Sequence, residues 1–525
     1  MGPVLHESPA PPDAVHTRAR RLLLFAAGLP LVTLLALHAL DVPLGCPGRM
    51  TYLYSRPPQL IGRLAALPAA AAIAGVLAVG VWLAGDAGRG RRTLGVLTAS
   101  AGIAAAGAWS YFSPPAHVNQ HVFNFISPSH DGAFVREALE IDDPGEYVRN
   151  FPQRARTPPA EMKGTRVISN PPATTLLIWW LREHVVTLPA LKTSLDDFLS
   201  RERVELPRER TLMSVALVSA WVLQLTWLLA TPLFYALARL FCDPAPALAY
   251  AICCVVSPMT LAFAPGKDAA QLLTLALPLL LFLRSLRRGS WVAGAAAGAV
   301  LIPTVLVSLV HAWLALALTA AATLATWRRR DDRNRCWFCT LLPAIGGALA
   351  SAAVVEFAFG VPLLATVAAV ARSQSEVTRG PDAMPLLWQL IGVPLFLLFA
   401  GPTLWAAALA AGQSRHPRAD AVDRARPPAD SAARFGFHLL IATSVVLIST
   451  APFTNAETPR LWIPFAPLLL LGALLVAQAN APRWVRDARF LALLVALQVG
   501  ASAAHWSLMD MREAEMRLTT GRLFR

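Results

Sequence analysis

The chain has 525 residues, of which 55% are hydrophobic and only 15% are charged. Because these few polar residues could not cover a globular surface in water, the composition excludes a soluble fold. Much of the chain must therefore face lipid. The formal net charge of +14 would indicate a nucleic-acid partner in a soluble protein. Here the arginines lie between hydrophobic runs, as in the cytoplasmic loops of membrane proteins, and we expect no nucleic-acid partner.

Five segments are expected along the chain. Residues 1–21 are Pro-rich and basic, which predicts a disordered cytoplasmic tail. Residues 22–112 hold the N-terminal transmembrane spans, and residues 113–207, the longest polar stretch, predict an exoplasmic loop with amphipathic surface helices. Residues 208–507 form the transmembrane core, and residues 508–525 form a C-terminal tail.

The hydrophobic runs predict an all-α, polytopic transmembrane helical bundle of about 13 spans, because a bilayer core needs roughly 20 apolar residues per helix. The count depends on residues 291–326, where a tight hairpin around Pro303 keeps the later loops on their expected sides. One long tilted span there would invert everything downstream. The predicted spans are 22–40, 64–84, 94–112, 212–240, 247–263, 270–282, 292–306, 309–326, 338–359, 386–411, 437–450, 462–477 and 490–504.

Arginine clusters between the predicted spans give the chain a single orientation, because cytoplasmic loops are enriched in basic residues. The long polar loop then lies on the extracytoplasmic face. The richness in Ala, Arg and Pro favours a bacterial source, so a multi-pass protein of the bacterial plasma membrane is expected. The predicted inside clusters are Arg89, Arg91 and Arg92; Arg284, Arg287 and Arg288; Arg328, Arg329, Arg330, Arg333 and Arg335; Arg415, Arg418, Arg424 and Arg426; and Arg483, Arg486 and Arg489.

The long polar loop carries two notable segments. His130 and Asp131 precede residues 132–141, whose apolar residues recur at helical spacing and predict an amphipathic surface helix. Asp131 would lie at the N-terminus of this helix, where the dipole favours a carboxylate, and taken alone it is more often a helix cap than a catalytic acid. Further along, Asn170 and a Pro-Pro step begin another helix with aromatic residues.

Two more polar segments begin apolar runs on the predicted outer face. Lys267 and Asp268 precede a long span, where such a pair can simply extend its charges to the interface. Glu457 and Arg460 precede a span near the C-terminal end. The planar guanidinium of Arg460 could bind a phosphate and Glu457 could orient it, whereas the alternative is an interfacial anchor beside Trp462.

Together these segments resemble the GT-C superfamily of integral membrane glycosyltransferases, in particular its protein mannosyltransferase and aminoarabinose transferase branches. In that family an outer loop carries an acidic residue followed by a surface helix, as at 131–141, and a Pro-Pro step opens the next helix, as after Asn170. Asp268 is similar to the second acidic loop, and residues 457–467 are similar to the C-terminal span. The family often has paired acids in the first loop, whereas Asp131 is flanked by His130 and Gly132.

The resemblance implies a hexosyl- or pentosyltransferase that moves a sugar from a polyprenyl-phosphate-linked donor to an acceptor, with inversion, at the outer face. Membrane lipid is its other expected partner, the acceptor is left open, and metal dependence is undecided. A transporter or flippase of a lipid-linked or anionic substrate is the alternative. The candidate residues are Asp131 and Asp268 for catalysis; His130, Lys267, Glu457, Arg460, Arg166 and Lys163 for substrate binding; and His130, Asp131 and Asp268 for a divalent metal.

Overall fold

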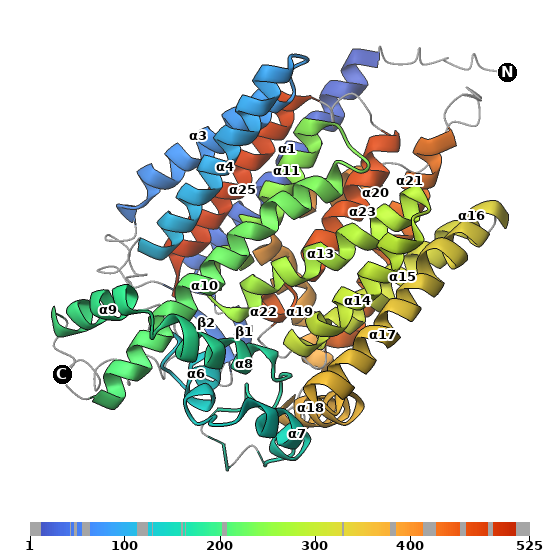
Figure 1. The fold of residues 1–525 in the computed structure, drawn as a ribbon. Coiled ribbons are helices and arrows are strands. Elements are labelled where there is room, and N and C mark those ends of the chain that lie inside the picture. Colours follow the sequence, from blue (N-terminus) through green and yellow to red (C-terminus); the bar gives the residue numbers. More distant parts are fainter. Residues whose placement is uncertain are drawn as a thin grey trace, which may run out of the picture.

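A bundle of long apolar helices makes up most of the molecule in the computed structural model (Figure 1). Nine helices in the part of the chain that the structure describes are long and apolar enough to cross a membrane, or ten if one bent helix pair counts as a span. The chain is therefore a membrane-embedded helical protein, as the composition predicts. The structure describes residues 12–42, 44–46, 50–54, 64–112, 124–128, 130–158, 161–162, 164–201, 207–327, 330–378, 385–412, 427–451, 458–480 and 487–510.

The helices follow the apolar runs closely. They are α1 (Pro12–Ala39), α3 (Leu67–Ala84), α4 (Arg89–Phe112), α6 (Gly132–Leu139), α7 (Pro144–Arg154), α8 (Ala173–Trp180), the π-helical turn η2 (Leu181–Val185), α9 (Pro189–Arg201), α10 (Pro207–Ala238), α11 (Pro244–Val255), α12 (Pro258–Ala262), α13 (Lys267–Arg288), α14 (Trp291–Val307), α15 (Val310–Thr326), α16 (Arg330–Cys336), the π-helical turn η3 (Trp337–Leu341), α17 (Leu342–Phe359), α18 (Leu363–Thr378), α19 (Pro385–Ala400), α20 (Pro402–Gly412), α21 (Pro427–Thr450), α22 (Thr458–Leu461), α23 (Phe465–Asn480) and α25 (Ala488–Leu508).

Two sequence predictions need adjustment at the helix level. The tail predicted to be disordered is helical from Pro12 onward, where a proline at the first helical position and the following Ala and Arg residues favour a helix. The predicted hairpin is present as α14 and α15, but the chain breaks at Ser308 and Leu309, and Pro303 lies inside α14. Because α14, α15 and part of α23 are shorter apolar helices, the count of about 13 spans stays a prediction.

A small antiparallel sheet accompanies the helices and was not predicted from the sequence. It contains β1 (Leu44–Cys46), β2 (Met50–Tyr54) and β3 (Met509–Asp510), in the order β1-β2-β3. Through the pairing of Tyr54 with Met509, the sheet joins the chain segment after α1 to the end of α25.

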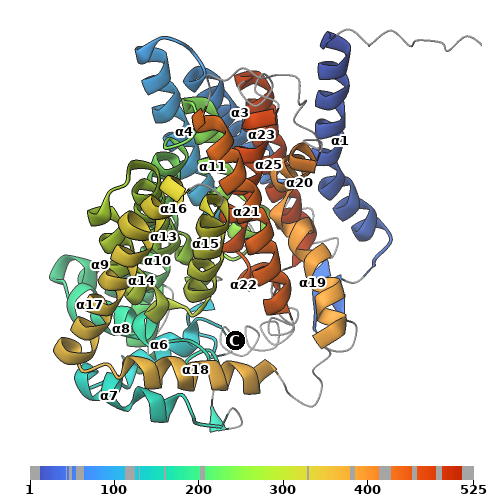
Figure 2. The same cartoon turned by 90° about the vertical axis from the view of Figure 1, so that its right-hand side faces the viewer.

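Short helices from the predicted outer loop form a layer across one end of the bundle. We call α6, α7, α8, α9 and the later α18 the end layer; Figures 1 and 2 show α6, α7, α8 and α18 together at the lower end, with α9 at the left-hand side. The turn between α3 and α4 and the basic helix α16 lie at the opposite end (Figure 1). The predicted surface helix is present as α6, but its apolar residues Phe134, Val135 and Ala138 are buried against protein.

The end layer is fastened to the bundle by one hydrophobic cluster, and Arg182 of η2 joins α6 to the end of α8. The cluster joins α6 and α8 to α10 and includes Ala270 of α13. Arg182 donates hydrogen bonds of 2.8–2.9 Å to the carbonyls of Ala138, Leu139 and Ile141. These bonds satisfy carbonyls that the end of α6 leaves without helical partners, so the C-terminal end of α6 is held in a defined place.

Small residues bring α14 and α17 into close contact. A Cβ atom added at Gly298 would lie 1.8 Å from the carbonyl oxygen of Ala344, and one at Gly347 would lie 1.9 Å from that of Ala295. Gly294 and Gly298 have the spacing of the small-residue motif that packs helices in membranes. The close approach fixes α17 beside α14 without interlocking large side chains.

Candidate functional site

Five charged side chains meet where the end layer touches the membrane helices. We call Asp131, Arg166, Lys267, Asp268 and Arg460 the charge cluster. Lys267, Asp268 and Asp131 are only 3%, 4% and 5% exposed, and the arginine side chains are 11% and 12% exposed. Charged groups this deeply buried require partners, and the cluster supplies them internally.

Asp131 is the N-cap residue of α6, but its side chain makes no capping hydrogen bond to that helix. Instead, Oδ2 accepts a hydrogen bond of 2.8 Å from the backbone N–H of Lys267, the first residue of α13. A carboxylate at this position satisfies an N–H that the helix cannot pair and interacts favourably with the helix dipole. The expectation that Asp131 caps the following helix is therefore wrong, since it caps a membrane helix far along the chain.

Arg166 joins the two carboxylates of the cluster. Its Nη1 lies 2.5 Å from Asp131 Oδ1, and its Nη2 lies 2.8 Å from Asp268 Oδ2. The guanidinium carbon also lies 5.6 Å from the ring centre of Phe134, on α6. The planar fork of an arginine can hold two acids at once, which a lysine ammonium does less specifically.

Lys267 contributes its side chain as well as its backbone. Its ammonium donates a hydrogen bond to Asn170 Oδ1 and lies 5.6 Å from the ring centre of Phe134. Asn170 in turn donates a hydrogen bond of 2.8 Å to the carbonyl of Arg166. The asparagine before the Pro-Pro step therefore orients both a cation and the segment that carries Arg166.

Asp268 is the second acid and connects the cluster to the C-terminal part of the chain. Arg460 Nε lies 3.2 Å from Asp268 Oδ2, and Gln271 Nε2 donates a hydrogen bond of 2.9 Å to Asp268 Oδ1. Three cationic and two anionic side chains leave an excess of one positive charge in the described cluster. Such an excess favours a bound anion.

The remaining predicted site residues fall outside this geometry. Lys163 and Glu457 lie outside the described residues. His130 precedes Asp131, and its Nδ1 lies 3.4 Å from the hydroxyl oxygen of Ser127. Among the residues that the structure describes, no three His, Cys, Asp or Glu side chains gather as metal ligands. Asp131 and Asp268 each engage Arg166, so a metal between them would have to displace that guanidinium.

An apolar cavity of about 220 Å³ lies within the bundle, and its lining on α13 begins at Leu275, seven residues beyond Asp268. We call it the α13 cavity; it lies between α13, α14, α15 and α17. Asp268 belongs to the charge cluster and Gln271 is hydrogen-bonded to it, and Leu275, Leu279 and Phe282 follow them at helical spacing along α13 and line the cavity. One helix thus carries a polar head and an apolar continuation.

A short polar chain marks the boundary between cluster and cavity. The Thr274 hydroxyl donates a hydrogen bond of 3.0 Å to the carbonyl of Gln271 and lies 3.0 Å from His311 Nε2. His311 also lines the cavity and is only 1% exposed. Sequence reasoning missed Asn170, Gln271 and His311 as site residues. Gln271 lies three residues from Asp268 on the same helix but is uncharged, and only tertiary contacts bring Asn170 and His311 near the site.

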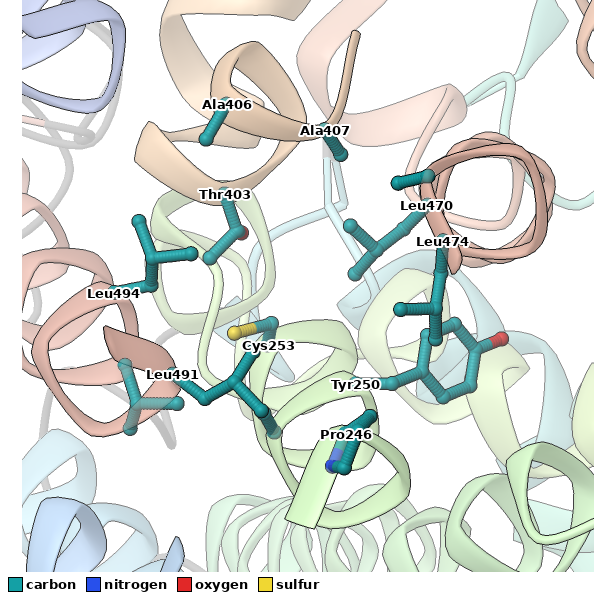
Figure 3. Close-up of a pocket in the computed structure, with 13 residues that line it drawn as sticks. Pro246, Tyr250, Cys253, Thr403, Ala406, Ala407, Leu470, Leu474, Leu491 and Leu494 are labelled. Carbon is teal, nitrogen blue, oxygen red and sulfur yellow. The ribbon is translucent and has the colours of Figure 1, made fainter. Parts of the chain in front are cut away.

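A second, smaller cavity of about 70 Å³ lies between α11, α20, α23 and α25 (Figure 3). Leu470 and Leu474 lie on one side of it and Leu491 and Leu494 on the other (Figure 3). The hydroxyl of the lining residue Tyr250 is engaged, since it donates a hydrogen bond of 3.1 Å to the carbonyl of Pro467. The lining is almost wholly apolar and includes no member of the charge cluster.

Two hydrogen bonds join α6 and α7 within the end layer. Arg154 on α7 donates bonds of 2.8 and 2.7 Å to the two oxygens of Glu137 on α6. The bonds to this carboxylate raise the pKa of Arg154 above its ordinary value. Burial of the Tyr147 hydroxyl, followed by the charge of Glu137, raises the pKa of Tyr147 well above its ordinary value.

No protein-family model matches the chain, and no curated protein matches it either.

Proposed function

We propose that the chain is a membrane glycosyltransferase of the GT-C kind, a hexosyl- or pentosyltransferase that uses a polyprenyl-phosphate-linked sugar. The observation that carries the proposal is the convergence of two acids and three cations, from four distant segments, beside an apolar cavity. Transfer takes place at the outer face and inverts the anomeric carbon. The acceptor is a hydroxyl-bearing molecule.

The chemistry of such a transfer needs three functions from the protein. A carboxylate takes the proton of the acceptor hydroxyl as that oxygen bonds to C1, while the bond from C1 to the phosphate oxygen breaks. Asp131 is the base, and Asp268 orients sugar hydroxyls and the cations. Arg460, Lys267 and Arg166 stabilise the negative charge that develops on the leaving phosphate.

The amphiphilic shape of the site supports a lipid-linked donor. A phosphate in the charge cluster would place an attached isoprenoid chain at the start of the stripe formed by Leu275, Leu279 and Phe282. The cavity is lined mainly by apolar side chains, as an isoprenoid requires, and His311 and Thr319 are among its few polar residues. This arrangement accounts for a polar centre that lies on the same helix as an apolar cavity.

The distribution of charge supports an extracytoplasmic site. The exposed Arg89, Arg91 and Arg92 and the basic helix α16 lie at the end of the bundle opposite the charge cluster. Basic residues gather on the cytoplasmic side of membrane proteins, so the end layer takes the outer side. About 13 spans are consistent with this orientation.

The decisive test measures sugar transfer in membranes that contain Asp131→Asn, Asp268→Asn or Asp142→Asn. The substrates are a panel of radiolabelled polyprenyl-phosphate sugars, and the readout is label in non-donor products. We expect losses of roughly 100-fold or more for Asp131→Asn, because a general base contributes about that much. Asp142 is exposed in the same layer, so its variant controls for the lost charge and should keep full activity.

Two results would count against this function. Wild-type membranes that transfer no sugar from any donor of the panel would remove the main support for a transferase. Undiminished transfer by a folded Asp131→Asn protein would remove the assignment of Asp131 as base, while leaving the reaction itself in place.

A transporter or flippase is favoured by one different observation. Helices α19 and α20 bend by 106° at Gly401, which has a φ of +85°. Gln498 supports this break, since Oε1 accepts hydrogen bonds from the N–H and hydroxyl of Thr403 and Nε2 donates to the carbonyl of Ala400. Discontinuous helices of this kind bind substrate in many transporters.

Proteoliposomes separate the two functions. A transporter would move a fluorescent polyprenyl-phosphate sugar between leaflets without changing it chemically, whereas a transferase would consume it only when acceptor is present. We expect chemical consumption. Movement of intact donor in the absence of acceptor, abolished by Gln498→Leu, would instead favour the transporter.

A further inference from the structure

The carboxylate of Asp131 lies in a setting that proteins use to bind phosphate. Asp131 Oδ2 accepts a hydrogen bond from the backbone N–H of Lys267, at the start of the 22-residue helix α13. Asp131 Oδ1 lies 2.5 Å from Arg166 Nη1. The ammonium of Lys267 is held nearby over Phe134. A helix N-terminus, a guanidinium and an ammonium together form a donor set suited to a phosphate group.

Two independent features indicate that the charge cluster takes a ligand. Among the residues that the structure describes, its charges do not balance, because three cations face two carboxylates in a buried setting. In addition, Gln271 is 3% exposed, and its Oε1 has no hydrogen-bond partner among the described residues. Gln271 is bonded to Asp268, so this acceptor lies within the cluster. A ligand with both a negative charge and a hydroxyl would satisfy both features.

We propose that the donor phosphate binds at the N-terminus of α13, between Arg166 and Lys267, in place of the Asp131 carboxylate. This inference rests on the proposed glycosyl transfer and adds the position of the phosphate and the order of events. The incoming phosphate displaces Asp131 from its ion pair. The carboxylate released in this way becomes free to accept the proton of the acceptor hydroxyl, so the base is available only when donor is bound.

The charge of the cluster also selects the class of donor. A sugar joined to a polyprenyl chain through one phosphate is a diester with a single negative charge, which neutralises the excess positive charge. A diphosphate-linked sugar carries a second negative charge and would leave an uncompensated anion in a buried site. The inference therefore assigns monophosphate-linked sugars as donors and disfavours diphosphate-linked ones.

Binding of farnesyl methyl phosphate to the full chain in detergent micelles tests the exchange. Farnesol, which lacks the phosphate, and farnesyl diphosphate serve as comparison ligands, and titration calorimetry gives the affinities. The proteins are the wild type, Asp131→Asn, Asp268→Asn and the exposed control Asp142→Asn. No transfer is required, so this result is independent of the activity assay.

Because Asp131 competes for the phosphate position, Asp131→Asn should bind farnesyl methyl phosphate roughly tenfold or more tightly than the wild type. Asp268→Asn alters only the neighbouring charge and should show a clearly smaller increase in affinity, and Asp142→Asn should show none. Adding Arg166→Gln to Asp131→Asn should abolish the increase in affinity. Farnesol affinity should be the same for all variants, and farnesyl diphosphate should bind the wild type less tightly than the monophosphate diester.

Equal gains for Asp131→Asn and Asp268→Asn would overturn the exchange, because they would show a response to net charge alone. No gain for Asp131→Asn would overturn it as well. If Asp131→Asn fails to fold, Asp131→Ser provides the same test, since serine is a good helix cap without charge. Failed exchange alongside active sugar transfer would leave the transferase proposal standing, whereas intact exchange without transfer would contradict the transferase proposal alone.

Discussion

Replacement of Arg166 by glutamine removes the guanidinium that joins Asp131 and Asp268. Breaking a buried charge pair by removing one partner destabilises a protein by about 3–5 kcal/mol. Asp131 would still accept the hydrogen bond from the backbone N–H of Lys267. Asp268 would still pair with Arg460 and accept the hydrogen bond from Gln271, so each acid retains part of its stabilisation. We therefore expect Arg166→Gln to lower the free energy of unfolding by about 3 kcal/mol, the lower end of that range.

Arg149→Gln is the matched control for this prediction. Arg149 Nη2 lies 3.8 Å from Asp143 Oδ2, and both side chains are more than half exposed, at 58% and 59%. An exposed pair of this kind contributes less than about 1 kcal/mol. Both variants lose one arginine from the chain between α6 and α8, so a difference between them reports burial and pairing.

Equilibrium unfolding of the purified protein in mixed micelles, followed by tryptophan fluorescence, measures the two free energies. The double variant Asp131→Asn with Arg166→Gln should recover part of the loss, because it no longer buries an unpaired acid at that position. If Arg166→Gln and Arg149→Gln change the unfolding free energy equally, the ion pairs of the charge cluster do not hold the end layer, and the reasoning fails.

Gly298→Ala should lower the free energy of unfolding by about 1–3 kcal/mol through overpacking, whereas Gly346→Ala, with open space around it, should be neutral or stabilising. Equal effects of the two variants would contradict the close contact of α14 and α17. Ala315→Phe should weaken use of long-chain donors by filling the α13 cavity, and Ala312→Phe, exposed on the same helix, should not; inhibition by both would argue against the cavity as the lipid site. Burial raises the pKa of Tyr147, so its phenol stays protonated in the folded protein while the same group in the unfolded chain ionises near pH 10. The free energy of unfolding should therefore fall as the pH rises above that value. Phenolate absorbance of the wild type and of Tyr147→Phe measures this ionisation, and ionisation of Tyr147 near pH 10 in the folded protein would refute the prediction.

The membrane helices were predictable because lipid imposes a local rule. Each apolar run must pair its own backbone groups, so helix positions follow from runs of hydrophobic residues. The hairpin of α14 and α15 was predicted correctly, although the break falls at Ser308 rather than at Pro303. A proline is tolerated inside a membrane helix when neighbouring groups satisfy the freed carbonyl, so its position alone does not locate a turn.

The sequence indicated most members of the charge cluster but not the contacts between them. Asp131, Lys267, Asp268 and Arg460 each stood out as a charge beside an apolar run. Their pairing could not be read from sequence, because Asp131 caps α13 rather than its own helix. Arg166, a minor candidate by sequence, proves to contact both acids, since long-range contacts depend on how the end layer folds over the bundle.

The sheet escaped prediction for a related reason. Strand β3 has only two residues and β1 only three, too few for an alternating pattern to stand out from the surrounding chain. Asn170 likewise carried no signal beyond its place before two prolines, and its role depends on Lys267, which is distant in sequence.

Helix α17 has no buried residue, yet it closes one side of the α13 cavity. A single peripheral helix, attached to α14 through glycines, therefore forms one wall of the cavity. Separation of that pair would open this wall on the outward side of the bundle, where apolar side chains of α17 are exposed. A hydrophobic ligand would consequently enter by lateral diffusion within the leaflet, and its rate of entry would depend on membrane fluidity more than on its concentration in the aqueous phase.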